Sequence, residues 1–407
     1  MPIIVQKYGG TSVANAERIQ NVARRIAATF DSGHQVVGVV SAMGDTTDLL
    51  IELAHQVSPS PAPRELDLLL STGEIVSCTL VAMALHALGY QAVSLSGGQA
   101  GIRTDAAHTR AHITGLEPQR VQRELQQGRI AIVAGFQGAT EEMDITTLGR
   151  GASDLTAVAL AAALRAERCE IYTDVEGIYT ADPRLVPQAR KLKEIGYEEM
   201  LEMASYGAKM QPRSIELAAV YNVPVLVKSS FVEAPGTLIH GGANMEQRNK
   251  VRGVAASRDV AKVTVLGVPD RPGIAAALFE PLAQEGISVD TIVQNASVER
   301  ITDVTFTVSS RDLKKALAIV EPLAKGIGAK GCRWDDRLAQ VSIVGTGMQN
   351  APGYAANMFR ALAEAGINIE MITTSEIRIT CIIEEGKVPA AVQALHAAFR
   401  LDEEQPT

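Results

Sequence analysis

The chain has 407 residues, of which 46% are apolar and only 4% aromatic, so it can form two or three packed domains with mainly aliphatic cores. Its formal net charge is -8 and it has no dense basic run, which argues against binding of a nucleic acid backbone. The four cysteines show no zinc spacing, the N-terminus does not resemble a signal peptide, and the longest apolar stretch in a helical context, 157–164, is too short to span a bilayer.

The first half of the chain alternates short runs rich in Val and Ile with helical patterns. The predicted strands cover residues 3–5, 36–40, 92–95, 130–134, 169–172 and 223–228, and the predicted helices include 16–28, 47–57 and 74–88. This alternation predicts an α/β domain, in which helices cover both faces of a mostly parallel sheet. Residues 235–252 are rich in Gly, Asn and charge and indicate a boundary, so we expect the first domain at 1–245.

After this boundary, two segments resemble each other. PGIAAALFEPLAQEGISVDTIV begins at Pro272 and PGYAANMFRALAEAGINIEMIT begins at Pro352, 80 residues later. Each follows a strand that ends in Gly and precedes two strand-like runs, which predicts the order β-α-β-β-α-β in both copies. We therefore expect a tandem of small ferredoxin-like domains at 260–335 and 338–407.

The segment KYGGTS at residues 7–12 leads from a predicted strand into a helix. Glycines let the backbone approach an anion closely, and free N–H groups ahead of a helix favour phosphate oxygens. Lys7 would add a charge that stabilises a transferring phosphoryl group. The segment is not a Walker A loop, and an ordinary strand–turn–helix corner with a surface lysine is an equally good interpretation.

Two further segments place polar groups at predicted helix starts. Residues 41–47 form a strand-to-helix loop whose hydroxyls could line a carboxylate site, although Thr47 is also a good N-cap residue. Glu74 follows a glycine at a predicted helix start, where a negative charge is stabilising in itself. It could also hold a substrate ammonium group.

The segment TTLGRGASD at residues 146–154 has the highest density of special residues. Arg150 lies between two glycines, which suits bidentate capture of a carboxylate. Asp154 could orient Lys7 or bind magnesium. Ser153 and Asp154 could instead form a simple N-cap, but the density of polar residues and glycines favours a functional site.

Pro and Gly also punctuate residues 173–184, which follow a predicted strand. Loops at the carboxyl ends of strands commonly carry nucleotide sites in open α/β sheets. Lys209 lies close to another glycine and is a weaker candidate. His108 and His112 have no evident third ligand, so we do not predict a metal site there.

Three of these segments, in this order, resemble the aspartate kinases of the amino acid kinase family. They are VQKYGGTS at 5–12, TTLGRGASD at 146–154 and YTDVEGIYTADPR at 172–184. The resemblance covers nearly the whole chain. It implies an amino acid kinase (carbamate kinase-like) sandwich followed by two ACT domains, in agreement with the repeat. One departure is Gln211, where many members have a histidine.

The resemblance also implies roles for individual residues. Lys7 and Asp154 are expected to be catalytic, with Asp154 positioning Lys7. The residues expected to hold aspartate are Ser41, Thr47, Glu74, Arg150 and Ser153. The residues expected to hold ATP are Lys7, Tyr8, Gly9, Gly10, Thr173, Asp174, Tyr179, Arg184 and Lys209. The residues expected to hold an effector in the first ACT domain are Asp270, Pro272, Gly273, Ile274, Gln294 and Asn295.

The implied reaction is transfer of the γ-phosphoryl group of Mg²⁺-ATP to the side chain of L-aspartate, giving 4-phospho-L-aspartate in the cytoplasm. This is the first step towards lysine, threonine and methionine, and lysine, threonine or both are the usual effectors of the family. A homo-oligomer, or an assembly with a shorter ACT-only subunit that starts near Met245, is expected. Two alternatives stay open, namely an amino acid kinase with another acceptor such as glutamate, and a non-catalytic amino acid sensor.

Overall fold

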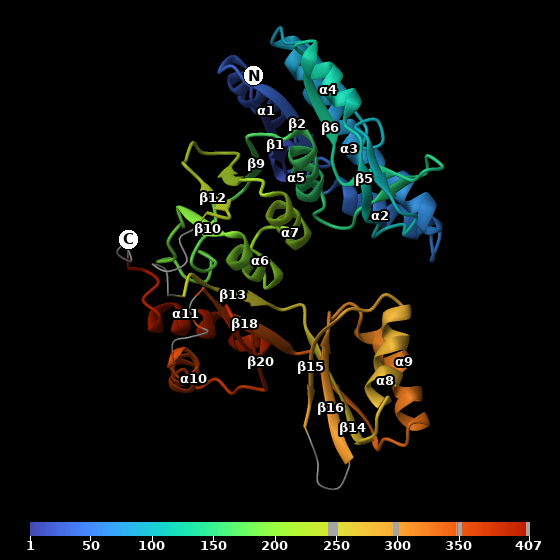
Figure 1. Cartoon of the computed structure of the whole chain (residues 1–407), viewed down its shortest axis with the longest axis vertical. Helices are drawn as coiled ribbons and strands as arrows, with labels where there is room; N and C mark the ends of the chain where they lie inside the picture. Colours follow the sequence, from blue (N-terminus) through green and yellow to red (C-terminus); the bar gives the residue numbers. More distant parts are fainter. Residues whose placement is uncertain (243–250, 296–300, 347, 349–351, 404–407) are drawn as a thin grey trace. The chain divides into compact units, whose positions relative to one another are not determined.

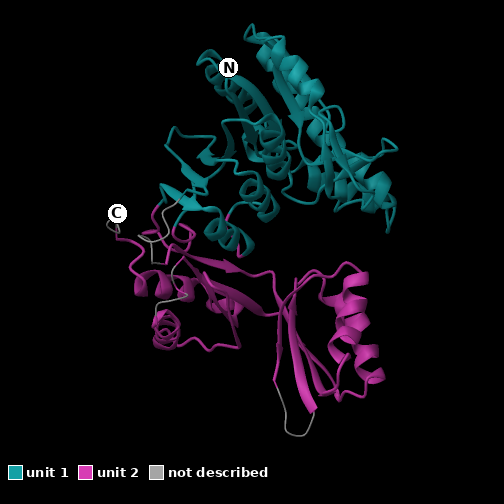
Figure 2. Ribbon diagram, viewed as in Figure 1, with its two compact units in different colours: residues 1–179, 191–205, 209–244 teal, residues 180–190, 206–208, 245–407 magenta. Residues whose placement is uncertain are grey.

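The computed structural model describes residues 1–242, 251–295, 301–346, 348 and 352–403. The chain divides into two compact units, which Figure 2 shows in different colours. Unit 1 comprises Met1–Tyr179, Lys191–Ser205 and Lys209–Asn244. Unit 2 comprises Thr180–Arg190, Tyr206–Ala208 and Met245–Thr407, so the chain enters unit 2 three times.

Unit 1 is built on an eight-stranded sheet with the order β10-β12-β11-β9-β1-β2-β6-β3 (Figure 1). Its strands are β1 (Ile3–Tyr8), β2 (Gln35–Val40), β3 (Ala92–Leu95), β6 (Ile130–Ala134), β9 (Arg168–Thr173), β10 (Glu194–Gly196), β11 (Val225–Ser229) and β12 (Thr237–His240). Every pair is parallel except β11 with β12. The predicted, mostly parallel sheet is therefore confirmed.

Helices lie on both faces of this sheet. On one face α1 (Ala16–Asp31) and α3 (Pro63–Ala87) pack together over apolar side chains of β2 and β6. On the other face α5 (Ser153–Leu164) packs against β1 and against α7 (Pro212–Tyr221). The remaining helices of unit 1 are η1 (Gly10–Val13), α2 (Thr46–Val57), α4 (Gln119–Gln126) and α6 (Tyr197–Ser205).

A second, four-stranded sheet of unit 1 lies in the order β5-β4-β7-β8. Its strands are β4 (Ile102–Thr104), β5 (Ile113–Leu116), β7 (Gln137–Ala139) and β8 (Ile145–Thr147). The last of these strands leads directly into the glycine-rich segment 148–151. Leu148 and Ala152 are buried in a small apolar cluster with Leu70 of α3, so this segment packs against the same helix that covers the large sheet.

Helix α3 differs from the prediction in two ways. It begins at Pro63, so Gly73 does not interrupt it and Glu74 lies in its middle, and the predicted helix start at Glu74 was wrong. By length and composition alone, α3 could also cross a membrane. This differs from the expectation that every apolar stretch in a helical context is too short to span a bilayer. Half of the most apolar 18-residue stretch of α3 is buried inside the protein, as in the core helix of a globular domain.

The first repeat of unit 2 has the predicted order β-α-β-β-α-β. Its elements are β14 (Ala261–Pro269), α8 (Ile274–Gln284), β15 (Val289–Gln294), β16 (Ile301–Val308), α9 (Leu313–Gly326) and β17 (Gly331–Asp335). The antiparallel sheet has the order β15-β16-β14-β17, and both helices pack on one apolar cluster with it. This is the ferredoxin-like arrangement.

The second repeat takes its last strand from elsewhere in the chain. Its own elements are β18 (Leu338–Val344), α10 (Tyr354–Glu364), β19 (Met371–Thr374), β20 (Arg378–Glu384), η3 (Glu385–Lys387) and α11 (Val388–Ala398). The sheet order is β13-β18-β20-β19, so β13 (Gly253–Ser257) takes the place that β17 has in the first repeat. The expected strand after the last helix was wrong, because an earlier strand occupies that edge.

The two repeats contact each other through corresponding residues. Lys262 of the first pairs with Glu370 of the second at 2.8 Å, and Gln340 of the second donates to Asp290 of the first at 2.9 Å. Asp290 and Glu370 are equivalent positions of the two repeats. Lys262 and Gln340 are also equivalent, because Lys262 directly precedes VTVLG in the first repeat and Gln340 directly precedes VSIVG in the second. Such reciprocal contacts are those of an approximate two-fold relation.

Two short segments that are flanked in the sequence by unit 1 belong to unit 2. Ala181 and Val186 lie in the apolar core of the second repeat. Thr180 hydrogen-bonds His396 of α11 at 2.9 Å. Gly207 has φ +111°, and a Cβ there would lie 2.3 Å from the carbonyl oxygen of Ala256 on β13, so only glycine fits.

Candidate active site

Lys7 and Asp154 form an ion pair at the carboxyl end of β1. Lys7 Nζ lies 2.7 Å from Asp154 Oδ1, and the two side chains are 12% and 11% exposed. β1 supplies the lysine, and the first turn of α5 supplies the aspartate. A single lysine held in a nearly buried position by one carboxylate can face an anion with its remaining N–H groups.

The glycine turn after β1 lies against the loop that follows β2. A Cβ on Gly9 would lie 3.5 Å from Lys7 Nζ, and one on Gly10 would lie only 2.8 Å from the carbonyl oxygen of Ala42. The amide of Gly44 donates to the carbonyl of Gly10 at 3.1 Å. The short helix η1 begins at once after Gly9, so its free N–H groups lie beside the lysine.

Two hydroxyl groups bridge the ends of β2 and α5. Ser41 Oγ donates to Ser153 Oγ at 3.0 Å. A Cβ on Gly135, at the end of β6, would lie 2.7 Å from Ser153 Oγ, so the glycine makes room for this contact. The structure therefore brings Ser41 and Ser153 together, next in sequence to Asp154.

Glu74 is 3% exposed and points from the middle of α3 towards the loop after β2. Its Oε1 accepts a 3.1 Å hydrogen bond from the amide of Ala42, while Oε2 has no partner within the part of the chain that the structure describes. Burial raises the pKa of Glu74 to about 7. Such a carboxylate is suited to receive a cation.

Helix α3 approaches this loop closely because residue 73 is glycine. A Cβ on Gly73 would lie 2.9 Å from Ala42 Cβ. The glycine that suggested a helix start is thus a packing requirement. It brings Glu74 within hydrogen-bonding distance of the loop.

Arg150 lies on the segment between β8 and α5, with φ +91° at Gly149 and +78° at Gly151. Its side chain is 74% exposed and forms an ion pair with Asp48 of α2. Thr47, the residue before Asp48, is half-buried. Gln211 caps α7 through Ser214 N, and its Cγ lies 3.6 Å from the position of a Cβ on Gly151, so the residue that departs from the family pattern adjoins this segment.

A second polar cluster lies at the ends of β9 and β11. Lys209 forms an ion pair with Asp174, and Thr173 Oγ1 donates to Asp174 at 3.1 Å. Burial would raise the pKa of Asp174, but the hydrogen bonds from Lys209 and Thr173 hold it below its usual value. Ser230 donates to the carbonyl of Thr173 and accepts from Ser12 Oγ at 2.8 Å, a link that the sequence analysis missed.

Three expected ATP residues have other surroundings. The side chain of Tyr8 is fully buried and stacks on Tyr172 at 4.8 Å in the core beneath α1, so its ring does not face the Lys7 side of the sheet. Tyr179 is half-buried, and its backbone forms an isolated antiparallel β-bridge with Lys191. Arg184 lies in unit 2 and pairs with Asp182 at 2.6 Å.

The expected effector residues lie at two parts of the first repeat, the turn after β14 and the end of β15, and β16 lies between these two strands in the sheet. Asp270, Pro272 and Gly273 form the exposed turn between β14 and α8, with Gly273 at φ +89°, and Ile274 is the buried first residue of that helix. Gln294 ends β15, and the carbonyl of Asn295 accepts from Thr302 Oγ1 at 2.6 Å. The side chains of Asp270 and Gln294 are exposed.

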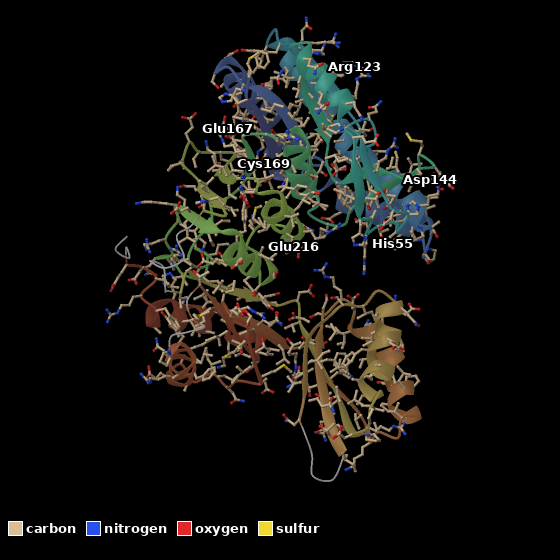
Figure 3. All side chains as sticks on the ribbon, in the orientation of Figure 1. His55, Arg123, Asp144, Glu167, Cys169 and Glu216 are labelled. Carbon is tan, nitrogen blue, oxygen red and sulfur yellow. The ribbon has the colours of Figure 1, made fainter. Side chains whose placement is uncertain are left out.

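The residues of the site are suited to the transfer of a group between two anionic molecules, and not to covalent catalysis by a cysteine. Cys169 of β9, labelled in Figure 3, is fully buried, and burial raises its pKa well above the usual value, so it is no nucleophile. In the described ranges no group of three or more His, Cys, Asp or Glu is placed to hold a metal. The oxygen donors Asp154 and Ser153 beside a lysine fit a Mg²⁺ ion that is bound mainly by phosphates.

Comparison with known proteins adds to this geometry. Residues 2–229 match the amino acid kinase family, and residues 262–324 and 341–399 match ACT domains. An aspartate kinase of Stutzerimonas stutzeri is 51% identical over 405 residues, covering 99% of this chain and 98% of that protein.

Two crystal structures of Escherichia coli aspartokinase III, each 27% identical, also resemble the chain. The complex with aspartate and ADP (R-state) has a TM-score of 0.85 and covers 98% of this chain and 100% of that one. The complex with lysine and aspartate (T-state) has a TM-score of 0.74, with 98% and 99% coverage.

Proposed function

This chain belongs to the aspartate kinases of the amino acid kinase family, and from that premise we propose which of its residues phosphorylate aspartate and how they are regulated. The observation that carries the proposal is the Lys7–Asp154 pair at 2.7 Å, beside the glycine turn and the buried carboxylate of Glu74. It combines a charge for a phosphate with an acceptor for an ammonium group in one region of unit 1.

In the proposed mechanism, a side-chain carboxylate oxygen of L-aspartate attacks the γ-phosphorus of ATP, and the bond from this phosphorus to the β,γ-bridging oxygen breaks. The products are an acyl phosphate, 4-phospho-L-aspartate, and ADP. A carboxylate is already ionised at neutral pH, so no general base is required. Lys7 and the backbone N–H group of Gly10 would stabilise the charge on the transferring group, whereas the N–H of Gly9 donates to the carbonyl of Tyr172 at 3.3 Å and Gly9 lets the turn approach closely. Asp154 would keep Lys7 in place, and alignment supplies much of the rate enhancement.

The acceptor would be held at its amino acid end. Glu74 would receive the ammonium group, Arg150 would leave Asp48 to bind a carboxylate, and Ser41, Thr47 and Ser153 would add hydroxyl contacts. Thr173 and Asp174, at the end of β9, and Lys209, in the segment before α7, would hold the nucleotide together with Tyr179. Arg184 lies in unit 2, and a nucleotide contact for it is proposed on the family resemblance alone. Mg²⁺, when bound with ATP, would neutralise phosphate charge, with Asp154 as its protein ligand.

Turnover of Lys7→Ala tests this proposal. The expected result is a loss of kcat by roughly two or more orders of magnitude with folding intact, since a preorganised charge at the transferring group typically contributes this much. Lys315→Ala, at a surface pair with Glu285 in the first ACT domain, is the matched control. A near-normal rate in Lys7→Ala would remove the lysine from the mechanism, and faster turnover of glutamate than of aspartate would overturn the acceptor.

We also propose that the chain catalyses the first step towards lysine, threonine and methionine in the cytoplasm, under feedback inhibition by lysine, threonine or both at the ACT domains. The similar E. coli enzyme has a T-state complex with lysine and aspartate, which supports lysine as an effector of this chain. Asp270, beside the N-terminus of α8, could bind both charged ends of an amino acid with the help of free helix N–H groups.

A homo-oligomer is a further part of the proposal. The outer strands β15 and β19 leave sheet edges open, and α2 and α3 expose Leu49, Leu53 and Met83. Assembly with a shorter ACT-only subunit stays an alternative. Its expected start, Met245, lies outside the described residues.

A further inference from the structure

Asp67 is a buried carboxylate that has no role in the proposed mechanism. It is 0% exposed and lies on α3, seven residues before Glu74 and on the same buried face. Burial of a charge is unfavourable unless hydrogen bonds and a counter-charge offset it, and an apolar side chain would avoid that cost. The partners of Asp67 show what its charge holds in place.

Three residues from two parts of the chain, a strand end and a loop, converge on Asp67. Thr147 Oγ1 donates to Oδ1 at 2.6 Å, and the amide of Thr109 donates to both oxygens at 3.1 and 2.9 Å. His108 Nδ1 lies 2.9 Å from Oδ2. One side chain therefore ties α3 to the end of β8 and to the loop between β4 and β5.

Both the end of β8 and the β4–β5 loop adjoin the segment that carries Arg150. Thr147 is the last residue of β8, three positions before Arg150. Thr109 has φ +71°, a strained value for a residue with a branched side chain, and its carbonyl oxygen lies 3.8 Å from the position of a Cβ on Gly149. The hydrogen bonds to Asp67 hold Thr109 in this conformation.

Arg213 of α7 completes the support. Its guanidinium donates to the carbonyl of Leu148 at 2.8 Å and to that of Ala111 at 3.3 Å. Among the residues that the structure describes, the side chain of Arg150 has only the exposed ion pair with Asp48 to fix it. The position of its backbone is therefore set by Asp67 on one element and by Arg213 on another.

We propose that Asp67 is a positioning residue that fixes the Arg150 segment relative to Glu74, and so selects an amino acid of the length of aspartate. This inference rests on the proposed function. Because α3 carries both Asp67 and Glu74, one rigid helix would set where the ammonium and the carboxylate of the acceptor are held relative to Lys7. A looser segment would bind aspartate less well and would tolerate the extra methylene of glutamate better.

Asp67→Asn is the direct test, with Glu124→Gln as its matched control, since Glu124 is another buried, ion-paired carboxylate on a different helix. We expect Asp67→Asn to raise the KM for aspartate about tenfold, the effect of losing one charged hydrogen bond, and to lower the aspartate-to-glutamate ratio of kcat/KM. The KM for ATP should stay within about twofold of wild type. Glu124→Gln should leave all three values unchanged.

Thr147→Val keeps the carboxylate and removes only its 2.6 Å hydrogen bond, so it decides the matter if Asp67→Asn does not fold. Thr147→Val should raise the KM for aspartate and lower the aspartate-to-glutamate ratio of kcat/KM. Both effects should be smaller than those of Asp67→Asn. A lower melting temperature with an unchanged KM and ratio in these variants would overturn the inference. If the wild-type protein itself fails to phosphorylate aspartate, the proposed function fails instead, so the two failures are distinguishable.

Discussion

At the scale of residues, the candidate site holds two nearly buried carboxylates in different surroundings, Asp154 in an ion pair with Lys7 and Glu74 in the middle of α3. Lys7 and Asp154 were expected to act together, and the structure pairs them. Glu74 was placed at a helix start because a glycine precedes it, whereas it lies buried in mid-helix. A single sequence does not show whether a glycine ends a helix or allows another element to approach.

The buried position of Glu74 predicts a pH dependence. With a pKa raised to about 7 by burial, the free enzyme should gain the carboxylate that receives the ammonium group as the pH rises from 6 to 8, so kcat/KM for aspartate should increase over this range. Glu74→Gln should lower kcat/KM and remove this step. A pH profile in the variant that keeps the same inflection would assign it to another group.

The same pKa has a consequence for stability. The folded protein keeps a proton on Glu74 between its usual pKa of 4.5 and about 7, while the unfolded chain does not. The free energy of unfolding should therefore fall as the pH rises through this range. Chemical denaturation at pH 5 and pH 8 measures the free energy of unfolding at each pH. The contribution of Glu74 to the decrease between these two pH values should be present in wild type and absent in Glu74→Gln.

At the scale of elements, the alternation of apolar runs and helical patterns was sufficient to predict the parallel sheet and the first ACT repeat. It was insufficient for the second repeat. There the edge strand next to β18 is β13, which precedes β18 in the chain, whereas the order of the first repeat would place this strand after α11. Pairing between strands distant in sequence is decided by packing and not by local pattern. The same holds for Asp67, whose partners lie about 40 and 80 residues away.

Helix α3 gives a prediction at this scale. Alanine normally stabilises a helix interior relative to glycine by about 1 kcal/mol. Gly73→Ala should nevertheless lower the melting temperature and raise the KM for aspartate, because its Cβ would meet Ala42 at 2.9 Å and push the helix away from the loop that Glu74 binds.

Gly326→Ala, at the end of α9 with no atom within 4 Å of the new Cβ, is the matched control and should be neutral or stabilising. Thermal unfolding and aspartate kinetics of both variants measure these effects. An increase in stability in Gly73→Ala would contradict the close packing of α3 on the loop.

At the scale of the whole molecule, regulation is the main prediction. Titration calorimetry of the full chain with lysine and with threonine should show heat for at least one of them, and the same amino acid should inhibit phosphorylation of aspartate. Asp270→Ala should weaken binding, whereas Asp336→Asn, an exposed aspartate outside the turn, should not. No heat and no inhibition from either amino acid would refute feedback control, and the native mass of the same samples tests the proposed oligomer.

The division of the chain between its units limits how such proteins can be recombined. Residues 180–190 and 206–208 belong to unit 2, with Ala181 and Val186 in its core and Gly207 against Ala256. A chimera that joins the first 244 residues of one parent to the remaining residues of another would therefore have a unit 2 core built from residues of both parents. An exchangeable regulatory part must also take both of these short segments from the parent that supplies the tail.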